Sequence, residues 1–166
     1  MFVRVKKISG NDYAYLVENA WTKYGTRQRV TAYLGKVIRP KTVEEYPYPE
    51  LKNHKQAIQE LIKRELQNKG FKEEDKLWVL EDLSVNLESG EVKKKNKDVA
   101  LGMNEGFLTK ATYQQALHFK LGETHDESAK ALAAACLEAG IKLSDAAFVR
   151  LFELQQPQET TTKVEY

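Results

Sequence analysis

Basic and aromatic side chains alternate through the first 41 residues of this 166-residue chain. Arg27, Arg29 and Tyr33 lie an even number of residues apart, so an extended strand places all three on one face. Guanidinium groups bind phosphate oxygens in charge-assisted hydrogen bonds, and aromatic rings stack on unpaired bases. Side chains of these two kinds at strand spacing predict a surface that binds nucleic acid.

The candidate residues for this surface come from two parts of the chain. The candidates for phosphate contact are the basic residues of the first segment and a later lysine run: Arg4, Lys6, Lys23, Arg27, Arg29, Lys36, Lys93, Lys94, Lys95 and Lys97. The candidates for stacking on bases are Tyr13, Tyr15, Trp21 and Tyr33. The lysines of the later run would form a second phosphate contact or reach into ribosomal RNA.

The charge of the chain is divided unevenly along its length. Residues 1–41 hold nine Lys and Arg against two acids, Asp12 and Glu18, which gives this segment a charge of +7. The whole chain has 26 Lys and Arg and 24 Asp and Glu, so the remaining residues carry −5. A positive segment of this kind attracts polyanions. The alternative is a solvated basic face with no partner.

Residues for catalysis or metal binding are few. The three histidines, His54, His118 and His125, have no paired spacing, and Cys136 is the single cysteine. Zinc sites and nucleophilic triads need several such groups together, and glycines 102 and 106 lack the Lys-Ser/Thr that completes a phosphate loop. We therefore expect no metal, no cofactor and no catalytic residue, with Cys136 as a small core residue.

Hydrophobic periodicity and turn residues predict an α+β fold. An N-terminal three-stranded antiparallel meander is followed by a helix over 50–68, a strand region over 77–87, a turn at 88–91 and a returning strand over 92–103. Three helices follow, capped by Thr109, Thr124 and Ser144. Whether the two β regions share one sheet is left open by the sequence.

The domain organisation follows from the prolines and from the composition. We expect a basic β module at 1–41, an α+β body at 42–156 and a flexible tail at 157–166, with a linker near the prolines at 40, 47 and 49. The first residues interleave charged and apolar side chains, so we expect no signal peptide, and no apolar run is long enough to cross a bilayer. These features predict a cytoplasmic protein without a membrane partner.

The last two helices are joined by a glycine-containing turn at 140–143, which is compatible with a helix-turn-helix. The second helix, however, begins with Asp145, Ala146 and Ala147. An acidic start with small side chains repels phosphate and reaches few bases. Ordinary packing of a helical hairpin is therefore the favoured interpretation.

The first 40 residues resemble the N-terminal region of DDE-type insertion-sequence transposases and of related archaeal proteins of unassigned function. The residues that carry the resemblance are Phe2 to Lys7, Tyr15 to Asn19, Gly25, Arg27 to Val30 and Tyr33 to Lys36. The catalytic domain of that family, with three separated acidic metal ligands, has no counterpart in this chain. The resemblance therefore implies a nucleic-acid-handling accessory module and brings no catalytic residue.

The expected function is a non-enzymatic nucleic-acid-binding protein, with RNA and DNA both open and a ribosomal setting among the options. The alternative is a protein-interaction or assembly module without nucleic acid. It is motivated by the acidic body and by an alanine-rich helix that allows close helix approach: Ala129, Ala131, Ala133, Ala134 and Ala135. An enzyme of unrecognised type is the third hypothesis, and a deep pocket with convergent polar groups would favour it. The oligomeric state is left open.

Overall fold

The structure is a computed structural model, and it describes residues 1–156. The expected tail at 157–166 lies outside the described residues. The strands are β1 (Phe2–Ile8), β2 (Asn11–Thr22), β3 (Gly25–Ile38), β4 (Lys72–Glu74), β5 (Leu77–Leu80), β6 (Leu83–Val85), β7 (Val92–Lys94), β8 (Lys97–Met103) and β9 (Gly106–Leu108). The helices are α1 (His54–Asn68), α2 (Lys110–Leu117), α3 (His125–Glu138) and α4 (Asp145–Glu153).

The strands form one mixed sheet in the order β1-β2-β3-β8-β7-β6-β5-β4, with β9 paired to β8. The pairing of β3 with β8 is parallel and the other pairings are antiparallel. The prediction of mixed α and β content with an antiparallel N-terminal meander is confirmed. The sheet is larger than predicted, because the two β regions join through β3 and β8.

The second β region turns between β6 and β7, close to the predicted turn at 88–91, and it reverses again at a place that was not predicted. The sequence suggested one strand over 92–103, but the chain reverses at Lys95 and Asn96, between β7 and β8. Both residues have positive φ, 48° and 69°, which is the backbone conformation that a two-residue hairpin turn requires. The turn therefore falls inside the lysine run, and Lys94 lies opposite Lys97 across the ladder.

Capping residues set the starts of the helices. The first helix begins at His54 instead of residue 50, because the Asn53 side chain accepts a hydrogen bond from the Gln56 amide and ends the preceding extended segment. The three predicted caps, Thr109, Thr124 and Ser144, each accept a backbone hydrogen bond in the same way. None of the helices within residues 1–156 is long and apolar enough to cross a membrane.

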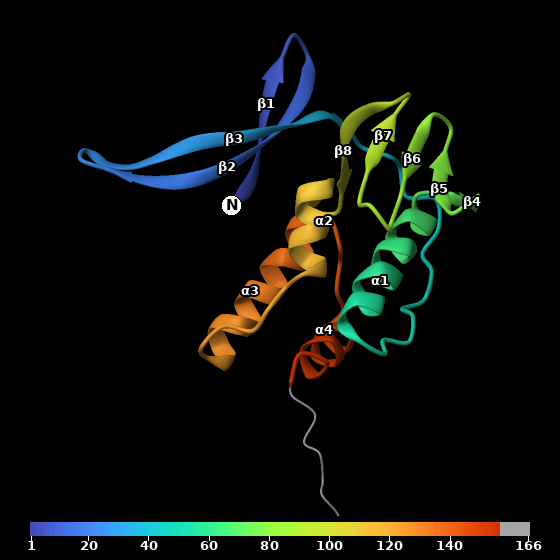
Figure 1. Cartoon of the computed structure of the whole chain (residues 1–166). Coiled ribbons are helices and arrows are strands. Elements are labelled where there is room, and N and C mark those ends of the chain that lie inside the picture. The colour runs from blue at the N-terminus through green and yellow to red at the C-terminus, as the bar shows by residue number, and fades with distance from the viewer. Residues whose placement is uncertain (157–166) are drawn as a thin grey trace, which may run out of the picture.

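The main core lies between α1, the strands β5 to β9 and the other three helices. In Figure 1 the helices gather on one side of the sheet, below it in this view. Ile58, Leu61, Ile62 and Leu66 form the apolar stripe of α1, and all four are fully buried. Cys136 is also in this core at 1% exposure, and its burial raises the pKa of the thiol to about 12. The prediction that Cys136 is a core residue is confirmed.

The proline-rich segment between β3 and α1 packs against α1. The Tyr48 ring lies 3.9 Å from the Arg64 guanidinium, and its hydroxyl donates to the Lys142 carbonyl at 2.8 Å. The Arg64 Nε also donates to the Tyr46 carbonyl at 2.8 Å. These contacts fix the segment that was expected to be a linker. The division into units at residue 41 stays a prediction, although the sheet continues across it.

We expect the stability of the fold to depend on pH through His54. This side chain is half-buried, its Nε2 lies 2.8 Å from the Ala116 carbonyl, and desolvation lowers its pKa below the ordinary value. The unfolded chain therefore takes up a proton at a pKa of about 6.5 while the folded chain resists it, so the free energy of unfolding falls as the pH drops from neutrality through that value. Urea unfolding between neutral and mildly acidic pH measures this slope, the change in the free energy of unfolding per pH unit.

His54→Gln should remove part of the slope, because the variant has no imidazole to protonate. His125→Gln, at the exposed start of α3, is the matched control and should keep it. Equal slopes in the wild type and in both variants would assign the pH dependence to other groups.

Candidate nucleic-acid interface

Two β-bulges in β3 decide which side chains share a face. Val17 of β2 pairs with Val30 but the preceding Leu16 pairs with Ala32, so Thr31 is an extra residue in β3. In the same way, Tyr15 pairs with Tyr33 but Ala14 pairs with Gly35, so Leu34 is a second extra residue. Arg29 therefore pairs with Glu18, whereas Tyr33 pairs with Tyr15. Arg27 pairs with Ala20 and therefore shares a face with Arg29, as predicted. Because residues 15 and 18 lie on opposite faces of β2, the prediction that Tyr33 shares this face is wrong.

The face of β2 that carries Tyr13 and Tyr15 is aromatic. The Tyr15 and Tyr33 ring centroids are 5.2 Å apart, and Tyr13 lies 6.4 Å from Tyr33. Lys6 of β1 places its ammonium 5.0 Å from the Tyr15 ring. Desolvation and the two neighbouring tyrosines raise the pKa of Tyr33 above its ordinary value, so its hydroxyl stays neutral at physiological pH. Tyr33 is nevertheless 58% exposed and offers its ring to a ligand.

A cleft of about 650 Å³ lies next to these tyrosines. It is lined by residues of β2, β3 and the β7–β8 hairpin: Tyr13, Tyr33, Lys36, Lys94, Lys95, Lys97, Asp98 and Val99. The pairing of Lys36 with Val99 brings β3 alongside β8, so β2 and β3 form one side of the cleft and the β7–β8 hairpin forms the other. The structure thus joins two basic segments that lie about 60 residues apart in the sequence. We call this feature the lysine–tyrosine cleft.

The lysine–tyrosine cleft is strongly positive. Lys94 and Lys97 are direct cross-strand partners, an arrangement that costs stability because like charges repel. Within residues 1–156, neither of them nor Lys36 or Lys95 forms a salt bridge. Asp98 is the single carboxylate among the lining residues. Such a group of lysines is stabilised when an anion binds between them.

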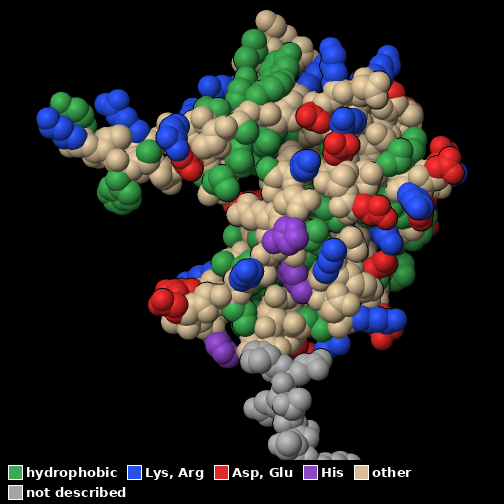
Figure 2. Space-filling model, in the orientation of Figure 1, with side chains coloured by type: hydrophobic (Ala, Val, Ile, Leu, Met, Phe, Trp, Pro, Cys, Tyr) green, Lys and Arg blue, Asp and Glu red, His purple; other side chains and the backbone are tan. Residues whose placement is uncertain are grey.

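The hairpin of β2 and β3 beyond the cleft forms an arm, residues 18–29. Figures 1 and 2 show it standing out from the body, with basic side chains along it and hydrophobic ones at its end. Trp21 is 87% exposed and Tyr24 is 79% exposed. Lys23 lies over the Tyr24 ring, with 5.8 Å between its ammonium and the ring centroid. Within residues 1–156, no part of the body covers these side chains.

The predicted binding residues therefore fall into three places. Tyr33, Lys36, Lys94, Lys95 and Lys97 line the cleft, and Tyr15 and Lys6 lie beside it. Trp21, Lys23, Arg27 and Arg29 are on the arm, where Arg29 is paired with Glu18, and Arg4 donates to Gln28 of the arm at 2.9 Å. Lys93 points to a smaller cavity of about 170 Å³, where it lies 3.9 Å from Glu91.

Sequence reasoning missed two residues of the arm. Asn19 and Gln28 are exposed and are direct register partners. Their amides were not singled out, because amide side chains carry no charge signal. The alternation of β2 from Tyr13 through Asn19 to Trp21 was visible in the sequence and places Asn19 on the aromatic face.

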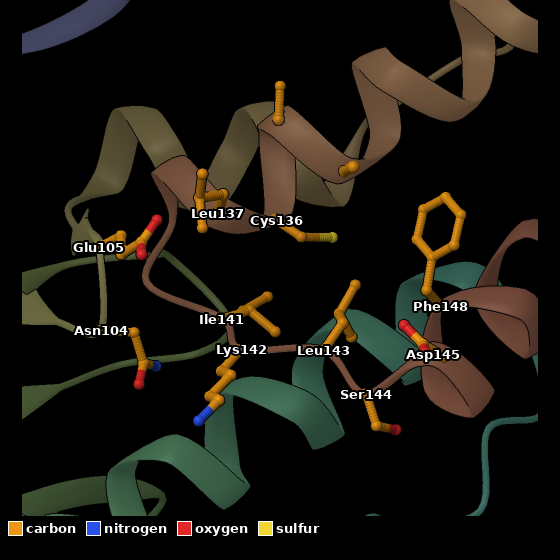
Figure 3. A pocket seen from close by; sticks show the side chains of 12 residues that line it. Asn104, Glu105, Cys136, Leu137, Ile141, Lys142, Leu143, Ser144, Asp145 and Phe148 are labelled. Carbon is orange, nitrogen blue, oxygen red and sulfur yellow. The ribbon is translucent and has the colours of Figure 1, made fainter.

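A second cavity, of about 690 Å³, lies between the β8–β9 turn, α3 and the start of α4 (Figure 3). Its walls are mainly apolar, with Leu137, Ile141 and Phe148 facing the space. Cys136 also lines it, but a thiol with a pKa of about 12 is not a nucleophile at neutral pH. No group of three or more His, Cys, Asp or Glu side chains suited to a metal ion occurs in residues 1–156.

Comparisons with known proteins give no family for this chain. No protein family, no curated protein and no solved structure matches it. The function proposed below therefore rests on the geometry and charge of this molecule.

Gly35 is predicted to be essential for assembling the lysine–tyrosine cleft. A Cβ atom at this position would lie 2.2 Å from the Asp98 carbonyl oxygen, and its φ is +117°. Gly35→Ala should therefore combine backbone strain with a clash against the backbone of β8, and lower the free energy of unfolding by about 3 kcal/mol or more.

Gly25→Ala is the matched control, because Gly25 has a similar φ of +112° but open space around its Cβ position. Gly25→Ala should lower the free energy of unfolding through backbone strain alone, by about 1 kcal/mol. Urea unfolding of both variants measures the difference. Equal losses would mean that the close approach of β3 and β8 is not needed for stability.

Proposed function

We propose that this protein binds nucleic acid without acting on it chemically, and that the lysine–tyrosine cleft holds an unpaired strand. The observation that carries the proposal is the meeting of Lys36, Lys94, Lys95 and Lys97 beside the exposed ring of Tyr33. Phosphates of a single strand would lie against the ammonium groups, and one base would stack on Tyr33. The resemblance of the first 40 residues to a transposase accessory region is consistent with this proposal and stays untested.

The shape of the cleft favours a single strand over a helix. An aromatic ring recognises a base through its face, and that face is accessible only when the base is not stacked within a duplex. The pair formed by Tyr15 and Tyr33 lies at the edge of the lysine group, so a base and its phosphate can be bound together. Lysine contacts do not distinguish RNA from DNA.

Reversing two cleft charges tests the phosphate contacts. Lys94→Glu with Lys95→Glu should weaken the binding of a single strand of about 12 nucleotides by at least tenfold near physiological salt, since two phosphate contacts are replaced by repulsion. The dependence of log K on log salt should also become shallower by about 1.4. Fluorescence anisotropy over a range of salt concentrations measures both quantities, with DNA and RNA probes.

The control for this experiment is Lys52→Glu with Lys55→Glu, which changes the net charge equally at exposed positions near the start of α1. It should leave the affinity within about twofold of the wild type. If both pairs weaken binding equally, the attraction is a property of net charge and the cleft is not the site.

Tyr33 provides a separate test of stacking. Tyr33→Leu should weaken single-strand binding by about fivefold to a hundredfold, because a stacked base is worth roughly 1–3 kcal/mol. Tyr33→Phe keeps the ring and should bind within about twofold of the wild type. Anisotropy titrations compare the two. A loss with Phe as large as that with Leu would show that the hydroxyl matters and the ring does not.

Protein interaction is the second candidate function, and the cavity of about 690 Å³ is the observation that favours it. Leu137 is 43% exposed at its edge, and Ala133 and Ala134 form a shallow wall. This is the alanine-rich helix that motivated the alternative. Leu137→Asp should abolish the binding of a protein partner at this cavity and leave the affinity for a single strand unchanged.

A further inference from the structure

The arm presents two different faces. Alternation along β2 places Glu18 and Ala20 on one face, and Asn19 and Trp21 on the other. The first face carries the ion pair of Glu18 with Arg29. The second carries the amides of Asn19 and Gln28 side by side and no carboxylate. The first face also carries Arg27, the partner of Ala20, so the arm has guanidinium groups on one face and uncharged amides on the other.

The amide pair has the chemistry of a base reader. Asn and Gln side chains form bidentate hydrogen bonds to the major-groove edge of adenine, which offers one donor and one acceptor. Arg4 donates to the Gln28 Oε1 at 2.9 Å, which holds this amide in place on the surface of the sheet. Lys23 and Arg27 lie further out on the arm, and within residues 1–156 neither forms a salt bridge.

The dimensions of the arm match one kind of groove. The major groove of B-form DNA is about 12 Å wide and admits a two-stranded β-ribbon, whereas the major groove of A-form RNA is too narrow for side chains to reach the bases. Residues 21–31 are all exposed, so the ribbon can enter a groove without the body colliding. We propose that the arm enters the major groove of duplex DNA, with Asn19 and Gln28 toward the bases and Lys23 and Arg27 at phosphates.

The arm and the cleft lie on the same face of β2, on either side of the buried Val17. Both bulges lie in β3, so β2 alternates without interruption and Tyr13, Tyr15, Asn19 and Trp21 share a face. Trp21 lies six positions after Tyr15 along the strand, which is a distance of about 20 Å. This step rests on the proposed function of the cleft. If the cleft binds a single strand and the arm binds a duplex, the preferred ligand is a DNA junction, in which a duplex continues into an unpaired strand.

The experiment compares four probes by anisotropy with the whole protein: a DNA duplex of about 20 base pairs, a single strand of about 12 nucleotides, the duplex with that strand as an extension, and the extended duplex made of RNA. The wild type should bind the DNA junction at least tenfold more tightly than either part alone. The RNA junction should bind no more tightly than the single strand, because its groove excludes the arm.

Two variants separate the parts of the proposal. Arg27→Glu with Gln28→Ala should reduce junction affinity to that of the single strand and leave single-strand binding unchanged. Asn11→Ala, exposed at the opposite end of β2, is the control and should match the wild type. Lys94→Glu with Lys95→Glu should reduce junction affinity to that of the duplex.

The outcomes distinguish the two proposals. An arm variant that binds every probe as the wild type does, or a wild type that binds the RNA and DNA junctions equally, overturns the assignment of the arm to the DNA major groove. A wild type that fails to bind the single strand overturns the proposed function of the cleft. Circular dichroism should show unchanged folding in the arm variants, since the substituted side chains are exposed.

Discussion

The short parallel pairing between β3 and β8 is the contact on which the rest of the molecule depends. Only three residue pairs form it: Lys36–Val99, Val37–Ala100 and Ile38–Leu101. It places Val37 and Ala100 in the small core beneath the N-terminal strands, together with Ala14. Gly35 makes the contact possible, because no Cβ atom fits against the Asp98 carbonyl. Without this contact the N-terminal strands would not share a sheet with the body, and the cleft would lack one side.

The molecule separates the residues that stabilise it from those that carry charge. The main core around α1 is fully buried and includes Glu65, which accepts hydrogen bonds from the Lys142 amide and the Asn104 side chain. The hairpin of β7 and β8, in contrast, holds Lys95 in the left-handed region, where a residue with a Cβ is strained. It also places Lys94 directly opposite Lys97, where the like charges repel. Positive φ also occurs at the Asp75–Lys76 turn, so the feature particular to the β7–β8 turn is its pair of like charges.

Local patterns of the sequence predicted most of the elements and the residue types of the surface. The stripe of α1 and the caps at Thr109, Thr124 and Ser144 depend on spacing within a few residues, and the structure confirms them. The positions of the bulges at Thr31 and Leu34 depend on how β3 packs against its neighbours, and no local pattern shows them. The bulge at Thr31 lies between Arg29 and Tyr33 and shifts the alternation by one residue, so these two side chains lie on opposite faces. The meeting of Lys36 with the later lysines depends on a pairing over a long sequence separation, which periodicity cannot predict.

The bulges also explain how the hairpin of β2 and β3 covers a core at one end and exposes both faces at the other. Near the body, β3 must turn Val37 toward the small core while Tyr33 stays exposed beside Tyr15. Farther out there is no core to cover, and both faces of the hairpin are free for polar side chains. Because each bulge adds one residue to β3 and none to β2, the strand β2 keeps a single alternation from the cleft to the end of the arm. Arg29 is thereby placed against Glu18 on the far face, and the amides of Asn19 and Gln28 stay on the face that continues from the tyrosines. The same irregularity that defeats a simple period-two analysis therefore keeps the aromatic and amide side chains on one face of β2, with the buried Val17 between them.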